Sequence, residues 1–325
     1  MRTQLSSQTP ILVTGAGGFA GSHLVELLQS HGFQNIFVTT YSSSKFLNQR
    51  LSSSFIFQGD LTDYSFTQSV IQQAQPQVIF HLAALSTVHD SVDKAKLMLT
   101  TNTVLQYNLL EAIRHHTPQA RVLAICSANQ YGLVKPEEVP ISENQPFRPL
   151  NPYAVSKLSQ EYLAYQYYLS YKLDVIRLRA FNHTGERQTP NFVIPAFAKQ
   201  IAEIEAGLKP PVIKVGNLEA IRDFTYVGDM VKAYLLAAEK GNSGAVYNLG
   251  SGHGVKIQAL LDKLIKLAQV KIEIEPDSDR LRPSDVPILI ADNSKFVQLT
   301  GWQLTTSLDE MLLKVLNYWR QQIKI

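Results

Sequence analysis

The sequence places a tyrosine and a lysine at a spacing that suits proton transfer. Tyr153 and Lys157 share one face of a predicted helix, about one turn apart. An ammonium about 4 Å from a phenol contributes roughly 4 kcal/mol at an effective dielectric of about 20, which lowers the pKa of the phenol by up to about three units. Ser127 comes directly after the preceding predicted strand and can hydrogen-bond a substrate oxygen. We predict that Ser127, Tyr153 and Lys157 form a catalytic centre in which Tyr153 exchanges a proton.

Three glycines, Gly15, Gly18 and Gly21, lie between a predicted strand and a predicted helix near the start of the chain. This spacing allows a tight turn at the first glycine, close approach of a pyrophosphate to the second, and close packing of the helix on the strand at the third. Free N–H groups at the start of the helix favour phosphate binding. No Gly-Lys-Ser/Thr sequence follows, which argues against an ATP-cleaving loop. We predict a dinucleotide site, and we expect Lys157 to bind the nicotinamide ribose as well.

The end of the second predicted strand indicates which dinucleotide is preferred. A carboxylate that binds the ribose is expected there when NAD(H) is preferred. The sequence instead reads Thr39-Thr40-Tyr41-Ser42-Ser43-Ser44-Lys45, which holds no acid to repel a 2′-phosphate. NADP(H) is therefore favoured over NAD(H). The residues predicted to contact the cofactor are Gly15, Gly18, Phe19, Ala20, Gly21, Tyr41, Ser42, Lys45, Asp60, Leu61, Leu82, Ala83, Ala84, Tyr153 and Lys157.

Short hydrophobic runs alternate with longer segments of helical periodicity in the first half of the chain. Parallel strands joined by crossover helices are buried on both faces, so this order predicts a doubly wound parallel α/β sheet of the Rossmann type. The predicted strands are 11–14, 36–40, 55–57, 78–81, 122–126 and 175–179, and the predicted helices are 19–31, 65–75, 95–116 and 152–172.

The pattern becomes looser after Arg179. Pro190, Pro195, Pro210 and Pro211 interrupt the next stretch, and the later elements are shorter, ending in an amphipathic helix at 308–323. We predict a dinucleotide-binding domain at 1–180 and a smaller C-terminal α/β substrate lobe at 181–325, some segments of which return to the first domain.

The composition is typical of a globular protein and excludes several kinds of function. The 325 residues carry a formal net charge of +3 and no basic block, which argues against a nucleic-acid partner. No hydrophobic stretch approaches the roughly 18 residues needed to span a bilayer. A single cysteine, Cys126, cannot form an internal disulfide, and the first residues lack the pattern of a secretion signal. We expect a cytoplasmic location, no membrane partner and no metal, since the adjacent His115 and His116 point in different directions along a helix.

Taken together, these motifs resemble those of the extended short-chain dehydrogenase/reductases, in particular their nucleotide-sugar branch. The resemblance covers nearly the whole chain, and the second half is similar to the GDP-mannose group, which contains 4,6-dehydratases and 4-keto-6-deoxymannose reductases. It implies an NAD(P)-dependent enzyme that binds a GDP-sugar and forms a homodimer through the helix bearing Tyr153. The matching motifs are Thr14-Gly-Ala-Gly-Gly-Phe-Ala-Gly21, Asp60-Leu61, His81-Leu-Ala-Ala84, Ser127, Tyr131-Gly132, Tyr153-x-x-x-Lys157, Phe181-Asn-His-Thr-Gly185, Val215-Gly-Asn-Leu-Glu-Ala-Ile-Arg-Asp-Phe224 and Leu281-Arg-Pro-Ser-Asp-Val-Pro287.

The same resemblance implies positions for the substrate. Two arginines are expected on its diphosphate, a role that suits arginine because the guanidinium stays charged and matches phosphate oxygens with two parallel hydrogen bonds. The residues implied are Asn182 along the sugar and α-phosphate, Val193 and Asn217 near the guanine, and Arg222 and Arg282 on the diphosphate, with Ser86 and Asn129 as further predicted substrate contacts.

Position 129 separates the two enzymes of this group. The dehydratases remove the C5 proton with a glutamate two residues after the catalytic serine or threonine, and that position is Asn129 here. An amide cannot take up this proton. The resemblance therefore favours NADPH-dependent reduction of a 4-keto-6-deoxy GDP-hexose at C4, giving GDP-D-rhamnose. A GDP-mannose 4,6-dehydratase and a nucleotide-sugar 4-epimerase remain alternatives, and a non-catalytic dinucleotide-sensing regulator is the alternative from a different class.

Overall fold

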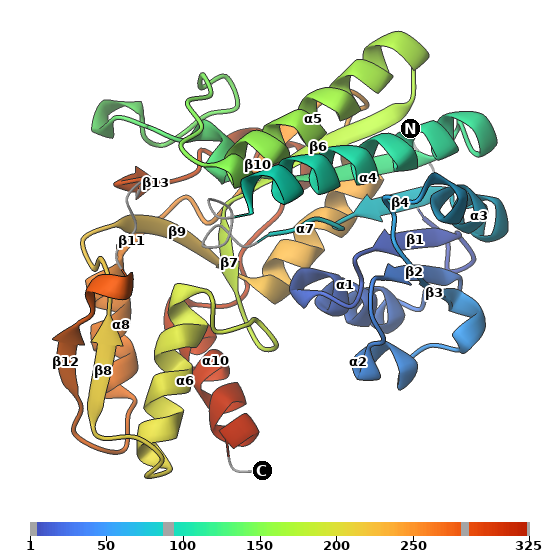
Figure 1. Cartoon of the computed structure of the whole chain (residues 1–325). Helices are drawn as coiled ribbons and strands as arrows, with labels where there is room; N and C mark the ends of the chain where they lie inside the picture. Colours follow the sequence, from blue (N-terminus) through green and yellow to red (C-terminus); the bar gives the residue numbers. More distant parts are fainter. Residues whose placement is uncertain (1–4, 87–93, 281–285, 324–325) are drawn as a thin grey trace.

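A parallel sheet of seven strands forms the centre of the larger part of the molecule (Figure 1). The structure is a computed structural model, and it describes residues 5–86, 94–280 and 286–323. Each neighbouring pair of strands in this sheet is parallel. In spatial order the strands are β10 (Val246–Leu249), β6 (Asp174–Ala180), β5 (Arg121–Ser127), β4 (Val78–His81), β1 (Ile11–Thr14), β2 (Ile36–Thr40) and β3 (Ile56–Gln58).

Hydrophobic side chains cover both faces of this sheet. In β1, Ile11 and Val13 face one core, Leu12 faces the other, and all three are fully buried. Two-sided burial of this kind is characteristic of parallel strands. The doubly wound α/β sheet predicted from the sequence is confirmed. The first core is completed by α1 (Phe19–Ser30) and α7 (Val227–Lys240), and the second by α3 (Tyr64–Ala74), α4 (Ala95–His116) and α5 (Pro152–Tyr171) (Figure 1).

The smaller part of the molecule has a hydrophobic core of its own. This core lies between the helices α6 (Val193–Glu205), α8 (Ile257–Lys266) and α10 (Leu308–Ile323) and the strand β8 (Val212–Val215), which pairs with β12 (Glu273–Pro276). Another small sheet contains β11 (Gly254–Lys256), β9 (Ile221–Tyr226), β13 (Ile288–Leu289) and β7 (Asn182–Thr184). Short helical segments are α2 (Lys45–Asn48), α9 (Ser294–Thr300), η1 (Ser53–Phe55), η3 (Ala128–Tyr131), η4 (Pro136–Glu138) and η5 (Ser278–Arg280).

The chain passes between the two parts more than once. β6 of the large sheet leads directly into β7, which pairs with β9 in the smaller part. β9 then leads directly into α7, which packs on the large sheet, and β10 follows as an edge strand beside β6. The strand β10 therefore belongs to the large sheet, and α7 packs on it, although both lie beyond residue 180. The predicted division of the chain at residue 180 remains a prediction about folding units.

The long helices are amphipathic. α4, for example, buries Met98, Leu105 and Leu109 and exposes Lys96 and Tyr107. Within the described residues, no helix combines the length and the hydrophobicity needed to cross a membrane.

Candidate active site

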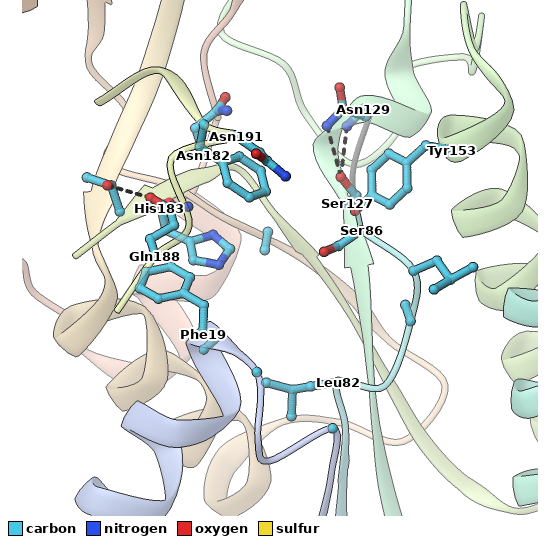
Figure 2. Close-up of a pocket in the computed structure, with 18 of the residues that line it drawn as sticks. Phe19, Leu82, Ser86, Ser127, Asn129, Tyr153, Asn182, His183, Gln188 and Asn191 are labelled. Carbon is cyan, nitrogen blue, oxygen red and sulfur yellow. Dashed lines mark hydrogen bonds between the residues drawn. The ribbon is translucent and has the colours of Figure 1, made fainter. Parts of the chain in front are cut away.

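A cavity of about 1470 Å³ lies between the carboxyl edge of the large sheet and the smaller part. Doubly wound sheets bind their ligands at this edge. Figure 2 shows the region around Ser127 and Tyr153. Apart from Lys45 and Arg282, the residues predicted to contact cofactor or substrate line this cavity. They are Gly15, Gly18, Phe19, Ala20, Gly21, Tyr41, Ser42, Asp60, Leu61, Leu82, Ala83, Ala84, Ser86, Ser127, Asn129, Tyr153, Lys157, Asn182, Val193, Asn217 and Arg222.

The turn from β1 into α1 leaves no space for a side chain at Gly15 or Gly21. Gly15 has a φ of +69°, and a Cβ at this position would lie 2.9 Å from the backbone of Ala83. A Cβ on Gly21 would lie 2.5 Å from the carbonyl oxygen of Gly15. The N-cap of α1 is Gly18, which has no side chain to bind the first N–H groups of the helix. An anion can reach these N–H groups directly, so the loop fits the pyrophosphate of a dinucleotide.

Hydroxyl groups form the cavity wall that follows β2. Tyr41, Ser42, Ser43 and Ser44 line the cavity, and none of them is acidic. Thr40 Oγ1 donates a hydrogen bond of 2.7 Å to the carbonyl oxygen of Ser42, which fixes the turn. This wall can accommodate a phosphate group without charge repulsion.

Lys45 does not take the position predicted for it. Ser44 is the N-cap of α2, and its Oγ accepts a hydrogen bond of 3.4 Å from the backbone N–H of Leu47. Lys45 is therefore the first residue of a helix, and it does not line the cavity. A helix of one turn has no clear periodicity, so the sequence pattern predicts a loop here. The structure gives no support for a contact between Lys45 and the cofactor.

Segments that follow β3 and β4 form another wall. Asp60 lines the cavity, and its carboxylate accepts a hydrogen bond of 2.8 Å from the backbone N–H of Thr62. After β4, the backbone N–H of Ala83 donates to Thr14 Oγ1 over 3.2 Å. The small side chains of Ala83 and Ala84 leave the backbone of this wall accessible from the cavity.

Ser127 ends β5, and Asn129 holds its hydroxyl group. Ser127 Oγ accepts hydrogen bonds from the backbone N–H of Asn129 (3.2 Å) and from its side-chain Nδ2 (3.3 Å) (Figure 2). Because both donors bind the oxygen, the serine proton remains available for donation. Asn129 therefore orients the hydroxyl as a donor.

A buried polar network lies behind Ser127. The backbone N–H of Ser127 donates to Gln130 Oε1 (2.8 Å), and Gln130 Nε2 donates to Glu161 Oε2 (2.8 Å). Glu161 is fully buried and forms an ion pair of 2.6 Å with Arg179. A buried network with paired members is rigid, so it fixes the backbone of the serine. The sequence did not reveal it, because only the fold brings Glu161 of α5 next to Arg179 of β6.

Lys157 is buried, and its ammonium is held by protein oxygen atoms. Nζ donates to the carbonyl oxygen of Ile125 (2.6 Å) and to Gln160 Oε1 (2.9 Å). Burial lowers the pKa of Lys157 to about 8. The lysine is thus charged at neutral pH and loses its charge as the pH rises through about 8.

Tyr153 forms part of the cavity wall beside Ser127 (Figure 2). Burial raises the pKa of its phenol, and a hydrogen bond with Ser127 acts in the opposite direction. The lowered pKa expected from the neighbouring Lys157 is therefore wrong for this structure. Burial disfavours the charged phenolate and dominates, while the lysine is directed at Ile125 and Gln160. The phenol keeps its proton at neutral pH, as a proton donor must.

The wall formed by the smaller part contains most of the predicted substrate contacts. Asn182 lies in β7, and Val193 is the first residue of α6. Asn217 follows β8, and Arg222 lies in β9. Arg282 lies outside the described residues.

The same wall contains His183, Gln188 and Asn191, which are not among the predicted site residues. His183 stacks on Phe19, with ring centroids 5.8 Å apart and planes inclined by 11°. Gln188 Oε1 accepts a hydrogen bond of 2.6 Å from Thr184 Oγ1. These residues lie across the cavity from the predicted catalytic centre (Figure 2). His183 lies inside the matching motif Phe181-Asn-His-Thr-Gly185, and this position was the signal that could have identified it.

The residues around the cavity do not indicate another kind of chemistry. Cys126 is buried, and burial raises the pKa of its thiol, so it is not a nucleophile. No group of three or more His, Cys, Asp and Glu side chains in the described part of the chain could hold a metal ion. The expectation that the protein uses no metal remains a prediction.

Known proteins are similar to this chain in both sequence and fold. A sequence model described as GDP-mannose 4,6 dehydratase matches residues 12–315. GDP-6-deoxy-D-mannose reductase of Pseudomonas aeruginosa is 34% identical over 249 residues, which cover 77% of this chain and 82% of that protein. The chain belongs to the extended short-chain dehydrogenase/reductases of the nucleotide-sugar branch.

Solved structures of extended short-chain dehydrogenase/reductases confirm the architecture. RMD from Pseudomonas aeruginosa complexed with NADPH has a TM-score of 0.84 at 30% identity, covering 97% of this chain and 100% of that one. UDP-glucose 4-epimerase of Thermus thermophilus in complex with NAD has a TM-score of 0.85 at 28% identity, covering 95% and 98%. Membership of this family makes the chain an NAD(P)-dependent nucleotide-sugar enzyme.

Proposed function

We propose that this enzyme reduces the C4 ketone of a GDP-linked 4-keto-6-deoxyhexose and forms GDP-6-deoxy-D-mannose (GDP-D-rhamnose). Asn129 is the observation that carries the proposal. Its amide donates to Ser127 Oγ at the position where the dehydratases of the family have the glutamate that removes the C5 proton. An amide cannot accept that proton near neutral pH. The similarity to GDP-6-deoxy-D-mannose reductase supports the same reaction.

The residues of the site supply the proton that a ketone reduction needs. When bound, NADPH supplies a hydride to C4 of the sugar. Ser127 donates a hydrogen bond to the ketone oxygen, which stabilises the negative charge that develops there. Tyr153, whose pKa is raised by burial, then transfers its proton to this oxygen. Lys157 presents its ammonium to the nicotinamide ribose.

The wall of the smaller part binds the nucleotide portion of the substrate in this proposal. Asn182 contacts the sugar and the α-phosphate, and Arg222 contacts the diphosphate. Val193 and Asn217 contact the guanine. The support is that all four residues line the same cavity as Tyr153.

We propose that NADPH is preferred over NADH, and that an aspartate in place of Ser42 reverses this preference. The wall formed by Tyr41, Ser42, Ser43 and Ser44 has hydroxyl groups and no acid. A carboxylate at Ser42 would repel a 2′-phosphate and could bind the ribose hydroxyls. Steady-state kinetics with both cofactors should give a higher kcat/KM with NADPH for the wild type and with NADH for Ser42→Asp.

The matched control for this prediction is Ser53→Asp. It adds the same charge on an exposed segment that does not line the cavity, so it should leave the cofactor preference unchanged. A wild-type enzyme that already prefers NADH would contradict the proposed preference.

Two incubations test the proposed reaction. GDP-mannose with NADP⁺ should remain unchanged, because Asn129 cannot remove the C5 proton. The 4-keto-6-deoxy sugar, made from GDP-mannose by a separate dehydratase, should be reduced with consumption of NADPH. NMR of the product should identify a GDP-linked 6-deoxymannose.

Each alternative activity has a distinct outcome in these experiments. If the enzyme itself forms the 4-keto-6-deoxy sugar from GDP-mannose, it is a dehydratase, and another residue must act as the base. If the purified protein retains bound NAD⁺ and interconverts UDP-sugars without net consumption of NADPH, it is an epimerase. The epimerase outcome is tested because the fold is also similar to that of UDP-glucose 4-epimerase.

We further propose a cytoplasmic homodimer. Exposed hydrophobic side chains on the neighbouring helices α4 and α5 support an interface there, because pairing with a second copy would cover them. The exposed residues are Leu97, Val104, Tyr107, Val155, Tyr162, Leu169 and Tyr171.

A further inference from the structure

The segment at residues 182–193 lies against one face of α1. It begins with Asn182 and ends with Val193, and both line the substrate side of the cavity. α1 begins at the glycine loop on the cofactor side. The two ligand-binding walls therefore meet along this helix. The residues of α1 that contact the segment are Phe19, Ser22, His23 and Glu26, spaced three and four positions apart on one face.

Arg187 is at the centre of this contact. Its Nε donates to Ser22 Oγ (3.0 Å), and Ser22 Oγ donates to the carbonyl oxygen of Phe19 (2.8 Å). Its Nη2 forms an ion pair with Glu26. The guanidinium also lies over the ring of Phe46, with Cζ 4.6 Å from the ring centroid. The edge of the guanidinium thus contacts Ser22 and Glu26, and its planar face contacts Phe46. A lysine has no planar group and could not make both kinds of contact.

Phe46 connects Arg187 to the wall that we propose for the 2′-phosphate. It is the second residue of α2, and the N-cap of α2 is Ser44, which lines the cavity. Arg50 also stacks on the Phe46 ring and pairs with Glu26 over 2.7 Å. One compact cluster therefore links the hydroxyl wall, α1 and Arg187.

The backbone of Arg187 is strained. Its φ is +69°, in the left-handed region that residues with a Cβ rarely adopt. Such a conformation persists where the surrounding contacts over-determine it, and it is concentrated at functional sites. The contacts with Ser22, Glu26 and Phe46 hold Arg187 in this conformation.

The neighbours of Arg187 in the chain are also fixed to both parts of the molecule. The carbonyl oxygen of Glu186 hydrogen-bonds His23 Nε2 over 2.8 Å. The carboxylate of Glu186 accepts a hydrogen bond of 2.9 Å from the hydroxyl of Tyr226, the last residue of β9. His183 stacks on Phe19. The segment is thus positioned by the cofactor side and the substrate side together.

We propose that Arg187 is a positioning residue that couples dinucleotide binding to nucleotide-sugar binding. A dinucleotide contacts the start of α1 and the hydroxyl wall, and these elements hold Arg187 through Ser22, Glu26 and Phe46. Arg187 in turn holds residues 182–193 where the nucleotide sugar needs them. By linkage, the nucleotide sugar increases the affinity for the dinucleotide by the same factor. The inference rests on the proposed function for the identity of the second ligand.

Calorimetric titration of GDP, with and without saturating NADPH, measures this coupling. In the wild type, NADPH should lower the Kd for GDP by about 5-fold or more. In Arg187→Gly this factor should fall to near unity. Glycine adopts a φ of +69° without strain, which offsets part of the loss of the side-chain contacts, so this variant should remain folded. Arg187→Lys should recover part of the coupling, because it keeps a charge beside Glu26 but lacks the planar face.

Arg320→Ala is the matched control. Arg320 pairs with Glu205 over 2.7 Å within the smaller part and does not line the cavity, so its removal should leave the coupling factor unchanged. A wild-type factor retained in Arg187→Gly would overturn the proposal, and so would a wild type without coupling. If UDP binds and GDP does not, the proposed substrate is wrong, but the same titrations with UDP still decide the role of Arg187. If neither nucleotide binds, both proposals fail.

Discussion

Replacing Tyr153 with phenylalanine is expected to lower turnover about 10²- to 10⁴-fold while NADPH binding is retained. The phenol lies beside Ser127 in the cavity wall, and burial raises its pKa, so it is a protonated donor at neutral pH. Phenylalanine keeps the ring and removes only the hydroxyl group that carries this proton. Stopped-flow measurement of NADPH oxidation, together with a fluorescence titration of NADPH, separates loss of chemistry from loss of binding.

Tyr162→Phe is the control for this prediction. Tyr162 lies on the same helix but is 57% exposed and does not line the cavity, so the loss of its hydroxyl should leave turnover unchanged. If Tyr153→Phe retains turnover within about 3-fold of the wild type, Tyr153 is not the general acid.

Replacing Arg222 with alanine is expected to raise the KM for the GDP-sugar about 10- to 100-fold and to change the KM for NADPH little. A charge-assisted contact with a diphosphate contributes about 1.5–3 kcal/mol, and each 1.4 kcal/mol corresponds to about tenfold in affinity. Arg222 lines the cavity, and its Nη1 donates to the carbonyl oxygens of Ile221 (2.9 Å) and Pro287 (3.4 Å). These contacts hold it in position before the substrate binds.

Lys256→Ala is the corresponding control. Lys256 is also cationic and lies on β11, the strand that pairs with β9, but it forms an ion pair with Glu219 and does not line the cavity. The KM values of this variant should match those of the wild type. Equal increases in both KM values for Arg222→Ala would show that this arginine has a structural role.

Most strands of the large sheet could be predicted because they are buried on both faces, but β10 was not among the predicted strands. The predicted segments 11–14, 36–40 and 78–81 coincide with β1, β2 and β4, and the predicted helix 95–116 coincides with α4. Two-sided burial produces continuous hydrophobic runs that are visible in the sequence. Strands such as β7, with three residues, or β13, with two, carry no comparable signal.

The sequence located the site better than it described its electrostatics. Ser127, Tyr153 and Lys157 could be identified because they are reactive residue types at the end of a predicted strand and at the start of a predicted helix. The fold brings all three to one cavity. The direction of the pKa shift of Tyr153 could not be predicted, because it depends on how deeply the phenol is buried. The positive φ of Arg187 could not be predicted from the sequence either, because contacts with residues far away in the chain determine it.

The return of α7 and β10 to the large sheet has a consequence for how this protein is made. As the chain emerges from the ribosome, the first 180 residues still lack α7, which covers one hydrophobic face, and β10, which covers the edge of β6. Bare faces and edges of this kind favour pairing with other chains, so the nascent sheet is vulnerable to aggregation. β7 and β9, which contain Asn182 and Arg222, are synthesised before these two missing elements. The sheet therefore cannot be completed before β7 and β9, which form part of the substrate wall, have been synthesised.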